Sequence, residues 1–266
     1  MSHNSDWHTA IAAENLIYKT EVGSGLHGIT IPGTDDHDEM GVCIPPPECV
    51  IGTASFEQYQ DRWHADGTRI PEGTRSGPGD TDQVIYSLKK YARLAAQGNP
   101  TVLLPLFVPP EKIYAMDAAG ASLRENRDLF LSKQAGERFL GYLTAQRERA
   151  QGLRGRKHTN RPELVEKYGY DTKMMYHALR LAIQGAELMD YHDITLPMNR
   201  DHSGYLLAVR RGAYPLEVVL EDLRDYTENL REAIVLSSLP EAPDYEDINN
   251  WLIGLHYHHW KSKGLL

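Results

Sequence analysis

The residues best suited to chemistry lie near the N-terminus, where Gly23-Ser24 is followed by Asp36-His37-Asp38. Glycine lets the backbone approach a ligand closely, and the free N–H groups of a helical turn, with the Ser24 hydroxyl, suit a phosphate group. Residues two apart on a strand point to the same side, so Asp36 and Asp38 repel each other unless a cation joins them. Carboxylate oxygens are hard ligands that favour Mg²⁺ or Mn²⁺. Although Asp-rich turns are common, the two halves together predict a phosphate-binding turn beside a metal site.

The elements that position these residues follow from the pattern around them. We expect a helix over residues 7–18, and then a short strand, 19–22, that runs into Gly23. A second strand, 40–44, would anchor the acidic pair in the core, and three prolines stop it at residue 45. Residues 52–80 are rich in Gly, Thr, Asp and Arg and predict a hairpin. A strand at 82–86 then leads into a helix at 87–97.

The second half of the chain has helical periodicity from about residue 124. The expected helices cover residues 133–152, 171–189, 215–237 and 247–259. The fold class predicted is α+β, with a mixed β-sheet flanked by helices and then a helical region. We place the two domains at residues 1–131, which would carry catalysis, and 132–266, which would bind substrate.

Composition narrows the classes of protein to consider. The chain has 266 residues, a net charge of −9 and 41% hydrophobic residues, enough for an ordinary core. It has no apolar run near the ~20 residues of a membrane span, and its polar start lacks a signal-peptide core, so we expect a cytoplasmic protein and no membrane partner. Cys43 and Cys49 are predicted to be reduced. An acidic protein is a poor binder of long duplex DNA.

Several stretches resemble one family. Gly-Ser followed about eleven residues later by Asp-x-Asp resembles the nucleotidyltransferases of the DNA polymerase β superfamily, and the longer strings resemble a subgroup associated with RNA repair in bacteria and phages. The stretches that carry the resemblance are Gly23-Ser24-Gly25-Leu26-His27-Gly28, the run from Thr34 to Val42, Ser87-Leu88-Lys89-Lys90, Gly98-Asn99-Pro100, Leu106-Phe107, Gly169-Tyr170-Asp171-Thr172-Lys173 and Tyr176-His177-Ala178-Leu179-Arg180-Leu181.

The resemblance implies a third carboxylate on a neighbouring strand. Asp82 is the first candidate, because Val84 and Tyr86 continue its strand, and Asp80 is the alternative. It also implies a two-metal transfer of a nucleotide monophosphate from an NTP or dNTP, with Mg²⁺ or Mn²⁺ bound by Asp36, Asp38 and Asp82. Gly23 and Ser24 would bind the phosphates. The acceptor implied by the subgroup is an RNA or DNA 3′ end.

Basic residues form two further candidate sites. Lys173, His177, Arg180 and Gln184 are spaced by four, three and four residues and share one stripe of a helix. A solvated face is the ordinary explanation, but the resemblance covers this helix and implies that Lys173, His177 and Arg180 contact phosphate. A basic stretch, suited to a nucleic-acid end or to a plain surface loop, contains Arg147, Arg149, Arg154, Arg156, Lys157 and Arg161, and weaker candidates are Arg210 and Arg211.

Other functions remain to be weighed. A catalytically silent nucleotide-binding or interaction module would keep this fold, and protein or small-molecule acceptors occur in the superfamily. A metal-dependent phosphohydrolase that uses the same carboxylates is a third hypothesis, which we disfavour. His256, His258 and His259 lack the spacing of a metal site and are interpreted as an incidental surface cluster. The nucleotide preference and the oligomeric state are left open by the sequence.

Overall fold

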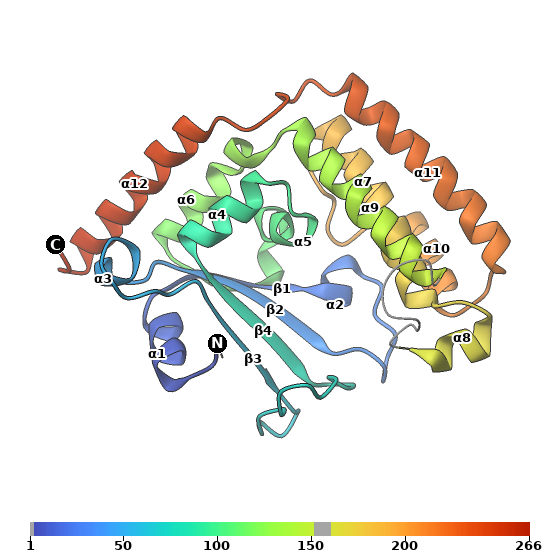
Figure 1. Ribbon diagram of the computed structural model, residues 1–266, viewed down its shortest axis with the longest axis horizontal. Helices are drawn as coiled ribbons and strands as arrows, with labels where there is room; N and C mark the ends of the chain where they lie inside the picture. Colours follow the sequence, from blue (N-terminus) through green and yellow to red (C-terminus); the bar gives the residue numbers. More distant parts are fainter. Residues whose placement is uncertain (1–2, 152–160) are drawn as a thin grey trace. The chain divides into compact units, whose positions relative to one another are not determined.

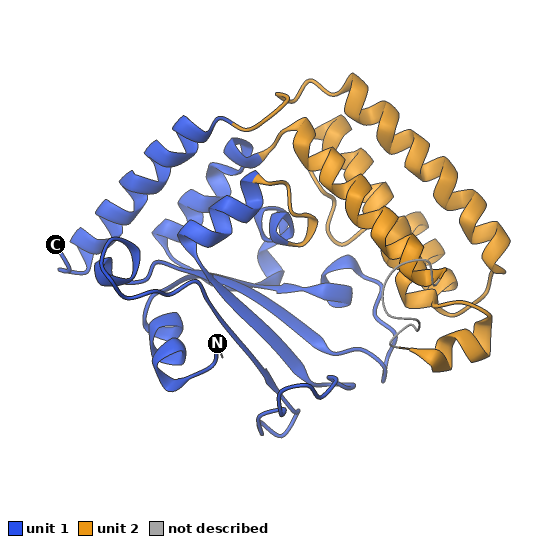
Figure 2. Cartoon of the chain, in the orientation of Figure 1, with its two compact units in different colours: residues 1–96, 102–130, 244–266 blue, residues 97–101, 131–243 orange. Residues whose placement is uncertain are grey.

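The structure is a computed structural model that describes residues 3–151 and 161–266 (Figure 1). The chain divides into two compact units, which are coloured separately in Figure 2. Unit 1 contains residues 1–96, 102–130 and 244–266, and unit 2 contains residues 97–101 and 131–243. The short helix α5 (Pro100–Leu103) includes residues of both units.

Unit 1 is built on a five-stranded mixed sheet in the order β3-β4-β2-β1-β5. β2 and β4 are parallel, whereas β1 is antiparallel to both β2 and β5, and β3 is antiparallel to β4. The predicted α+β class is confirmed. The strands are β1 (Leu16–Val22), β2 (His37–Cys43), β3 (Gln58–Trp63), β4 (Thr81–Ser87) and β5 (Ile113–Met116).

Helices cover both faces of this sheet. α4 and α6 lie on one side in Figure 1 and α1 lies on the other. Under α1, Ala12 packs in a buried cluster with Cys43, Tyr59 and Ile85. The register of the strands places these three residues on one face of the sheet, since Tyr59 pairs with Ile85 and Cys43 pairs with Ser87, two residues further along β4. The helices and 3-10 turns of unit 1 are α1 (Asp6–Glu14), α2 (Gly23–His27), α3 (Pro47–Val50), α4 (Leu88–Ala96), η1 (Leu104–Phe107), η2 (Pro110–Lys112), α6 (Ala118–Glu125), η3 (Arg127–Phe130) and α12 (Tyr245–Ser262).

Unit 2 is a helical bundle around a central helix, α9, which packs against α7, α10 and α11. Gly185 of α9 permits this approach, because a Cβ at that position would lie 3.0 Å from the Cβ of Phe139 and 3.1 Å from Leu230. The expected helices at 133–152, 171–189 and 215–237 are confirmed. The helices of this unit are α7 (Lys133–Ala150), α8 (Pro162–Tyr168), α9 (Thr172–Tyr191), α10 (Arg200–Arg210) and α11 (Leu216–Leu236).

The first half departs from expectation in two places. The opening helix ends at Glu14 rather than at Tyr18, because Leu16 onward pairs with β2 and the buried Ile17 and Tyr18 belong to the sheet. The second strand begins at His37, three residues earlier than expected, so Asp38 lies within it. Both differences arise from pairing between strands, which cannot be predicted from the local periodicity of the sequence.

Candidate active site

Three carboxylates meet at the ends of two neighbouring strands. The parallel register of β2 and β4 places Asp38 opposite Asp82, and Asp36 directly precedes β2. One oxygen from each of Asp36, Asp38 and Asp82 lies within 4.8 Å of the others, and all three residues are half-buried. The structure therefore brings together the three acidic residues that were proposed from the sequence.

Electrostatics at this triad favour a bound cation. Burial raises the pKa of Asp82, the neighbouring charge of Asp36 raises it further, and a hydrogen bond from Ser76 Oγ to Asp82 Oδ1 at 2.5 Å opposes the rise. Three carboxylates at such separations repel one another unless positive charge is shared between them. Carboxylate oxygens are hard ligands of the kind that divalent cations prefer. The three residues could therefore hold a metal ion.

Gly23 and Ser24 open α2 immediately beside the triad. Gly23 has φ +72°, and a Cβ added there would lie 2.0 Å from Asp38 Oδ2. Glycine is required both for the backbone angle and for the space that the Asp38 carboxylate occupies. The turn that was predicted to bind phosphate is therefore in contact distance of one predicted metal ligand.

Asp80, the alternative third carboxylate, belongs to the neighbouring loop. Its Oδ2 accepts from the Gly77 N–H at 2.7 Å, and its Oδ1 lies 3.0 Å from His64 Nδ1. The Gly77 hydrogen bond first, and then the one with His64, lower the pKa of Asp80. Asp80 thus organises the approach to β4, two residues before the carboxylate that joins the triad.

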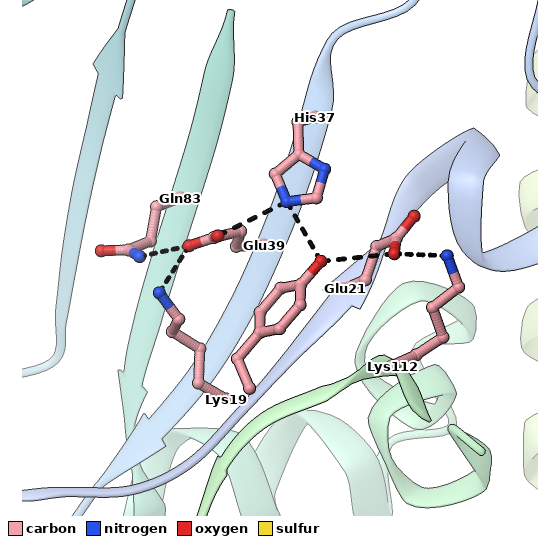
Figure 3. A network of polar contacts seen from close by, with 7 residues as sticks. Lys19, Glu21, His37, Glu39, Gln83 and Lys112 are labelled. Atoms are coloured by element: carbon pink, nitrogen blue, oxygen red, sulfur yellow. Dashed lines mark hydrogen bonds and ion pairs between the residues drawn. The ribbon is translucent and has the colours of Figure 1, made fainter. Parts of the chain in front are cut away.

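The opposite face of the same strands carries a continuous polar network (Figure 3). His37, between the two aspartates, points to this face, and its Nε2 lies 3.2 Å from Tyr114 Oη and 3.5 Å from Glu39 Oε1. Glu39 Oε2 accepts from Lys19 Nζ at 2.7 Å. The other contacts of the network are Gln83 Nε2 to Glu39 Oε2 at 2.6 Å, Tyr114 Oη to Glu21 Oε2 at 3.3 Å and Lys112 Nζ to Glu21 Oε2 at 2.6 Å.

Comparison with known families agrees with this geometry. A sequence model of the RNA repair pathway DNA polymerase beta family, RlaP, matches residues 3–254. The chain belongs to this family. An uncharacterized 38.9 kDa protein of Enterobacteria phage T4, from the nrdC-mobD intergenic region, is 27% identical over 133 residues. That match covers 49% of this chain and 37% of the phage protein, so it spans little more than a third of the relative.

A solved structure also aligns with this chain, at low sequence identity. It is the crystal structure, at 1.90 Å resolution, of a nucleotidyltransferase-like protein from Exiguobacterium sibiricum 255-15, with 14% identity and a TM-score of 0.28. The alignment covers 97% of this chain and 73% of that protein. In residues 3–151 and 161–266, no helix is long and apolar enough to cross a membrane.

The basic stripe of α9 lies within unit 2. Arg180 is 8% exposed and Gln184 is fully buried, so a solvated face does not describe these two residues, whereas Lys173 and His177 are half-buried. Burial first, and then the charge of Arg180, hold the pKa of His177 well below its ordinary value. Arg180 and Gln184 are buried because they face the interior of the bundle, where the packing of α9 against α7, α10 and α11, rather than residue type, determines exposure.

Arg210, which the sequence ranked low, is 9% exposed and lies over the Tyr176 ring at 4.8 Å. Of the basic stretch after α7, the residues Arg154, Arg156 and Lys157 lie outside the described residues. Arg161 lies 4.0 Å from the buried carboxylate of Asp171. The sequence placed Arg161 in the basic stretch and Arg210 among the weaker candidates, but it associated neither with α9, because both are distant from that stripe along the chain.

The C-terminal histidines differ from expectation. His256 and His259 are buried, with 6% and 7% exposure, so the interpretation as a surface cluster is wrong for both, whereas His258 is exposed. Their burial follows from helical geometry, because His256 and His259 lie on the same face of α12 as the buried Trp260. Cys43 and Cys49 are free thiols, as expected.

Proposed function

We propose that this protein is a metal-dependent nucleotidyltransferase that transfers a nucleotide monophosphate from an NTP or dNTP to an acceptor hydroxyl. The observation that supports this most strongly is the meeting of Asp36, Asp38 and Asp82 within 4.8 Å, beside the Gly23-Ser24 turn. Among acceptors, an RNA or DNA 3′ end is our first candidate, since the family is named for RNA repair.

The residues are assigned as follows. Asp36 and Asp38 would hold one Mg²⁺ or Mn²⁺, and both would share a second with Asp82. When bound, such ions neutralise phosphate charge and lower the pKa of an attacking hydroxyl. Gly23 and Ser24 would hold the phosphates by a backbone N–H and the Ser24 hydroxyl.

The reaction proposed is a displacement at the α-phosphorus. The acceptor oxygen forms a bond to that phosphorus, the bond to the bridging oxygen breaks, and pyrophosphate leaves with the electron pair. The hydroxyl proton passes to solvent. The protein contributes positioning and charge stabilisation, for which groups held on strands are well suited. In unit 2, we propose Lys173, His177 and Arg180 as phosphate contacts, and we retain residues 132–266 as the substrate-binding region.

The test is a transfer assay with α-labelled NTPs or dNTPs, Mg²⁺ or Mn²⁺, and RNA, DNA or no added acceptor. We expect metal-dependent label transfer that disappears in the Asp36→Ala, Asp38→Ala double variant and in Asp82→Asn. Asp80→Asn is the matched control, because Asp80 lies two residues from Asp82 but outside the triad, and it should retain transfer. Transfer that persists in the double variant would refute the proposed site.

The assay also separates two alternatives. Label recovered on the protein itself, or on a small molecule, would assign a different acceptor to the same chemistry. If NTP binds but no label is transferred to any acceptor, a silent nucleotide-binding module explains the fold better. The intact triad argues against that module, because three carboxylates held together serve no stabilising purpose without a cation.

A further inference from the structure

The loop that joins β3 to β4, residues 64–80, returns to the acidic triad through one side chain. Ser76 Oγ donates to Asp82 Oδ1 at 2.5 Å, and both residues are half-buried. The loop hydroxyl thus binds the carboxylate that stands on β4, whereas the other two carboxylates of the triad belong to the segment that enters β2.

The chain just before Ser76 is held by an arginine of β3. Arg62 is directly opposite Asp82 in the antiparallel pairing of β3 with β4, so the two side chains lie on the same face of the sheet. Arg62 Nη1 donates to the carbonyl oxygen of Thr74 at 2.5 Å. The strand next to Asp82 therefore fixes the loop two residues before the serine.

The chain just after Ser76 is closed into a turn by Asp80. The Gly77 N–H donates to Asp80 Oδ2 at 2.7 Å, and the Asp80 N–H donates back to the Gly77 carbonyl oxygen at 3.2 Å. Asp80→Asn keeps an acceptor for the Gly77 N–H, so the turn stays closed in that variant. With Arg62 on one side and this turn on the other, the position of the Ser76 hydroxyl is fixed from both directions.

The same turn is hydrogen-bonded to the chain on each side of Asp36. The Gly79 N–H donates to the Asp35 carbonyl oxygen at 3.1 Å, and the His37 N–H donates to the Asp80 carbonyl oxygen at 2.7 Å. The backbone that carries Asp36 and the loop that carries the serine are therefore parts of one hydrogen-bonded frame, which fixes the two groups relative to each other.

A purely local role explains the Ser76 contact poorly. Loop serines commonly bond to the backbone a few residues away, but this one binds a carboxylate that two like charges repel. An aspartate side chain can rotate, and the repulsion favours rotation of Asp82 away from Asp36 and Asp38. The hydrogen bond opposes that rotation. Because a carboxylate has about four lone-pair positions, the bond leaves room for a cation on the same group.

We infer that Ser76 is a positioning residue whose hydroxyl holds the Asp82 carboxylate toward Asp36 and Asp38, so that the triad is set for a divalent cation before the cation binds. Hydrogen-bond partners of this kind orient metal ligands in proteins. The inference rests on the metal site of the proposed function, but it requires neither the transfer reaction nor any particular acceptor.

The experiment titrates the full chain with Mn²⁺ alone and measures free Mn²⁺ by electron paramagnetic resonance. Ser76→Ala should weaken Mn²⁺ binding by roughly ten- to a hundredfold, the range for losing the hydrogen-bond partner of a metal ligand. Ser76→Thr keeps a hydroxyl and should bind close to the wild type. Urea denaturation in EDTA checks that each variant is folded. A purely structural serine would change stability in EDTA and leave the Kd of Mn²⁺ unchanged, which would overturn the inference.

Thr74→Ala is the matched control, because Thr74 lies in the same loop with an exposed side chain, and Arg62 binds only its backbone carbonyl. It should bind Mn²⁺ like the wild type. Equal losses of Mn²⁺ affinity in Thr74→Ala and Ser76→Ala would indicate a general disturbance of the loop and would contradict a specific role for the serine.

The transfer assay gives a second readout. Raised Mn²⁺ should restore transfer in Ser76→Ala, since all three carboxylates remain, but not in Asp82→Asn, and failure to restore it in Ser76→Ala would contradict positioning through the metal. If Ser76→Ala loses Mn²⁺ affinity but no variant transfers label, the inference stands and the transferase function fails. If the wild type transfers label and Ser76→Ala keeps wild-type affinity, the inference alone fails. A wild type that binds no Mn²⁺ would overturn both.

Discussion

Replacing Gly23 by alanine tests the contact between the turn and the acidic triad. Gly23 and Gly33 both have positive φ, +72° and +75°. A Cβ at Gly23 would lie 2.0 Å from Asp38 Oδ2 and 2.9 Å from Asp38 Cβ, whereas a Cβ at Gly33 would meet nothing within 4 Å. Gly33→Ala therefore carries the backbone penalty alone and serves as the matched control.

The magnitudes follow from these distances. An alanine in the left-handed region costs roughly 1–2 kcal/mol, which is what we expect for Gly33→Ala. In Gly23→Ala, rotation of the Asp38 side chain can relieve the contact with Oδ2 but not the contact with Cβ, so α2 and β2 must also separate. Such overpacking adds about 1–3 kcal/mol. Displacement of the Asp38 carboxylate by about 1 Å should lower transfer by roughly a hundredfold.

The assay combines urea denaturation with label transfer at saturating Mg²⁺. Gly33→Ala should lose stability but keep a transfer rate close to that of the wild type, measured well below its unfolding temperature. Gly23→Ala should be less stable than Gly33→Ala and should lose transfer under conditions where it is folded. Wild-type transfer by Gly23→Ala, or an equal loss in both variants, would refute the assignment of this turn to the site.

Three further predictions concern the triad, the buried histidines and the polar network. Mg²⁺ at about ten times its Kd should raise the free energy of unfolding of the wild type by about 1.4 kcal/mol, and thermal denaturation of Asp38→Asn should lack this gain. Burial lowers the folded-state pKa of His256 below its ordinary 6.5. The unfolded chain therefore takes up the proton first, and the free energy of unfolding should fall as the pH drops below about 6.5, by up to about 1.4 kcal/mol per pH unit. His256→Gln should flatten this pH profile in part, whereas His258→Gln, at an exposed position, should not. Glu39→Gln removes the partner of the half-buried Lys19 at 2.7 Å and should lower the free energy of unfolding by roughly 1–3 kcal/mol in urea titrations, with no effect if solvent already satisfies the lysine.

The helices of the second half could be predicted because their apolar positions recur with helical spacing over many residues. α10 and β5 could not be predicted from the sequence. Only three of the eleven residues of α10 are buried, and β5 is a four-residue edge strand with two exposed positions, so neither has a strong period. α12 begins at Tyr245, far along the chain from Phe130, yet it belongs to unit 1. Its packing is likewise determined by tertiary contacts that no local pattern reports.

At the candidate site, the predictable residues are those whose partners are near in the sequence or on an adjacent strand. Asp36 and Asp38 are two residues apart, and the parallel pairing of β2 with β4 brings Asp82 opposite Asp38. The basic residues around α9 could not be predicted in this way. Arg161 and Arg210 approach α9 from separate elements, and the burial of Arg180 depends on how α7, α10 and α11 surround that helix. Charge spacing along one helix predicted a stripe, but it did not predict that Arg180 and Gln184 are buried.

The two faces of β2 explain why the acidic site tolerates its own repulsion. Asp38 points to the triad, whereas His37 and Glu39 point to the network in which Glu39 binds Lys19 and Gln83. The polar contacts of Glu39 are thus made on the face opposite the triad. Because side chains alternate, the register that satisfies Glu39 also places Asp38 opposite Asp82. A strand held in this way can keep carboxylates close together before any cation arrives, and that preorganisation is what metal-assisted transfer requires.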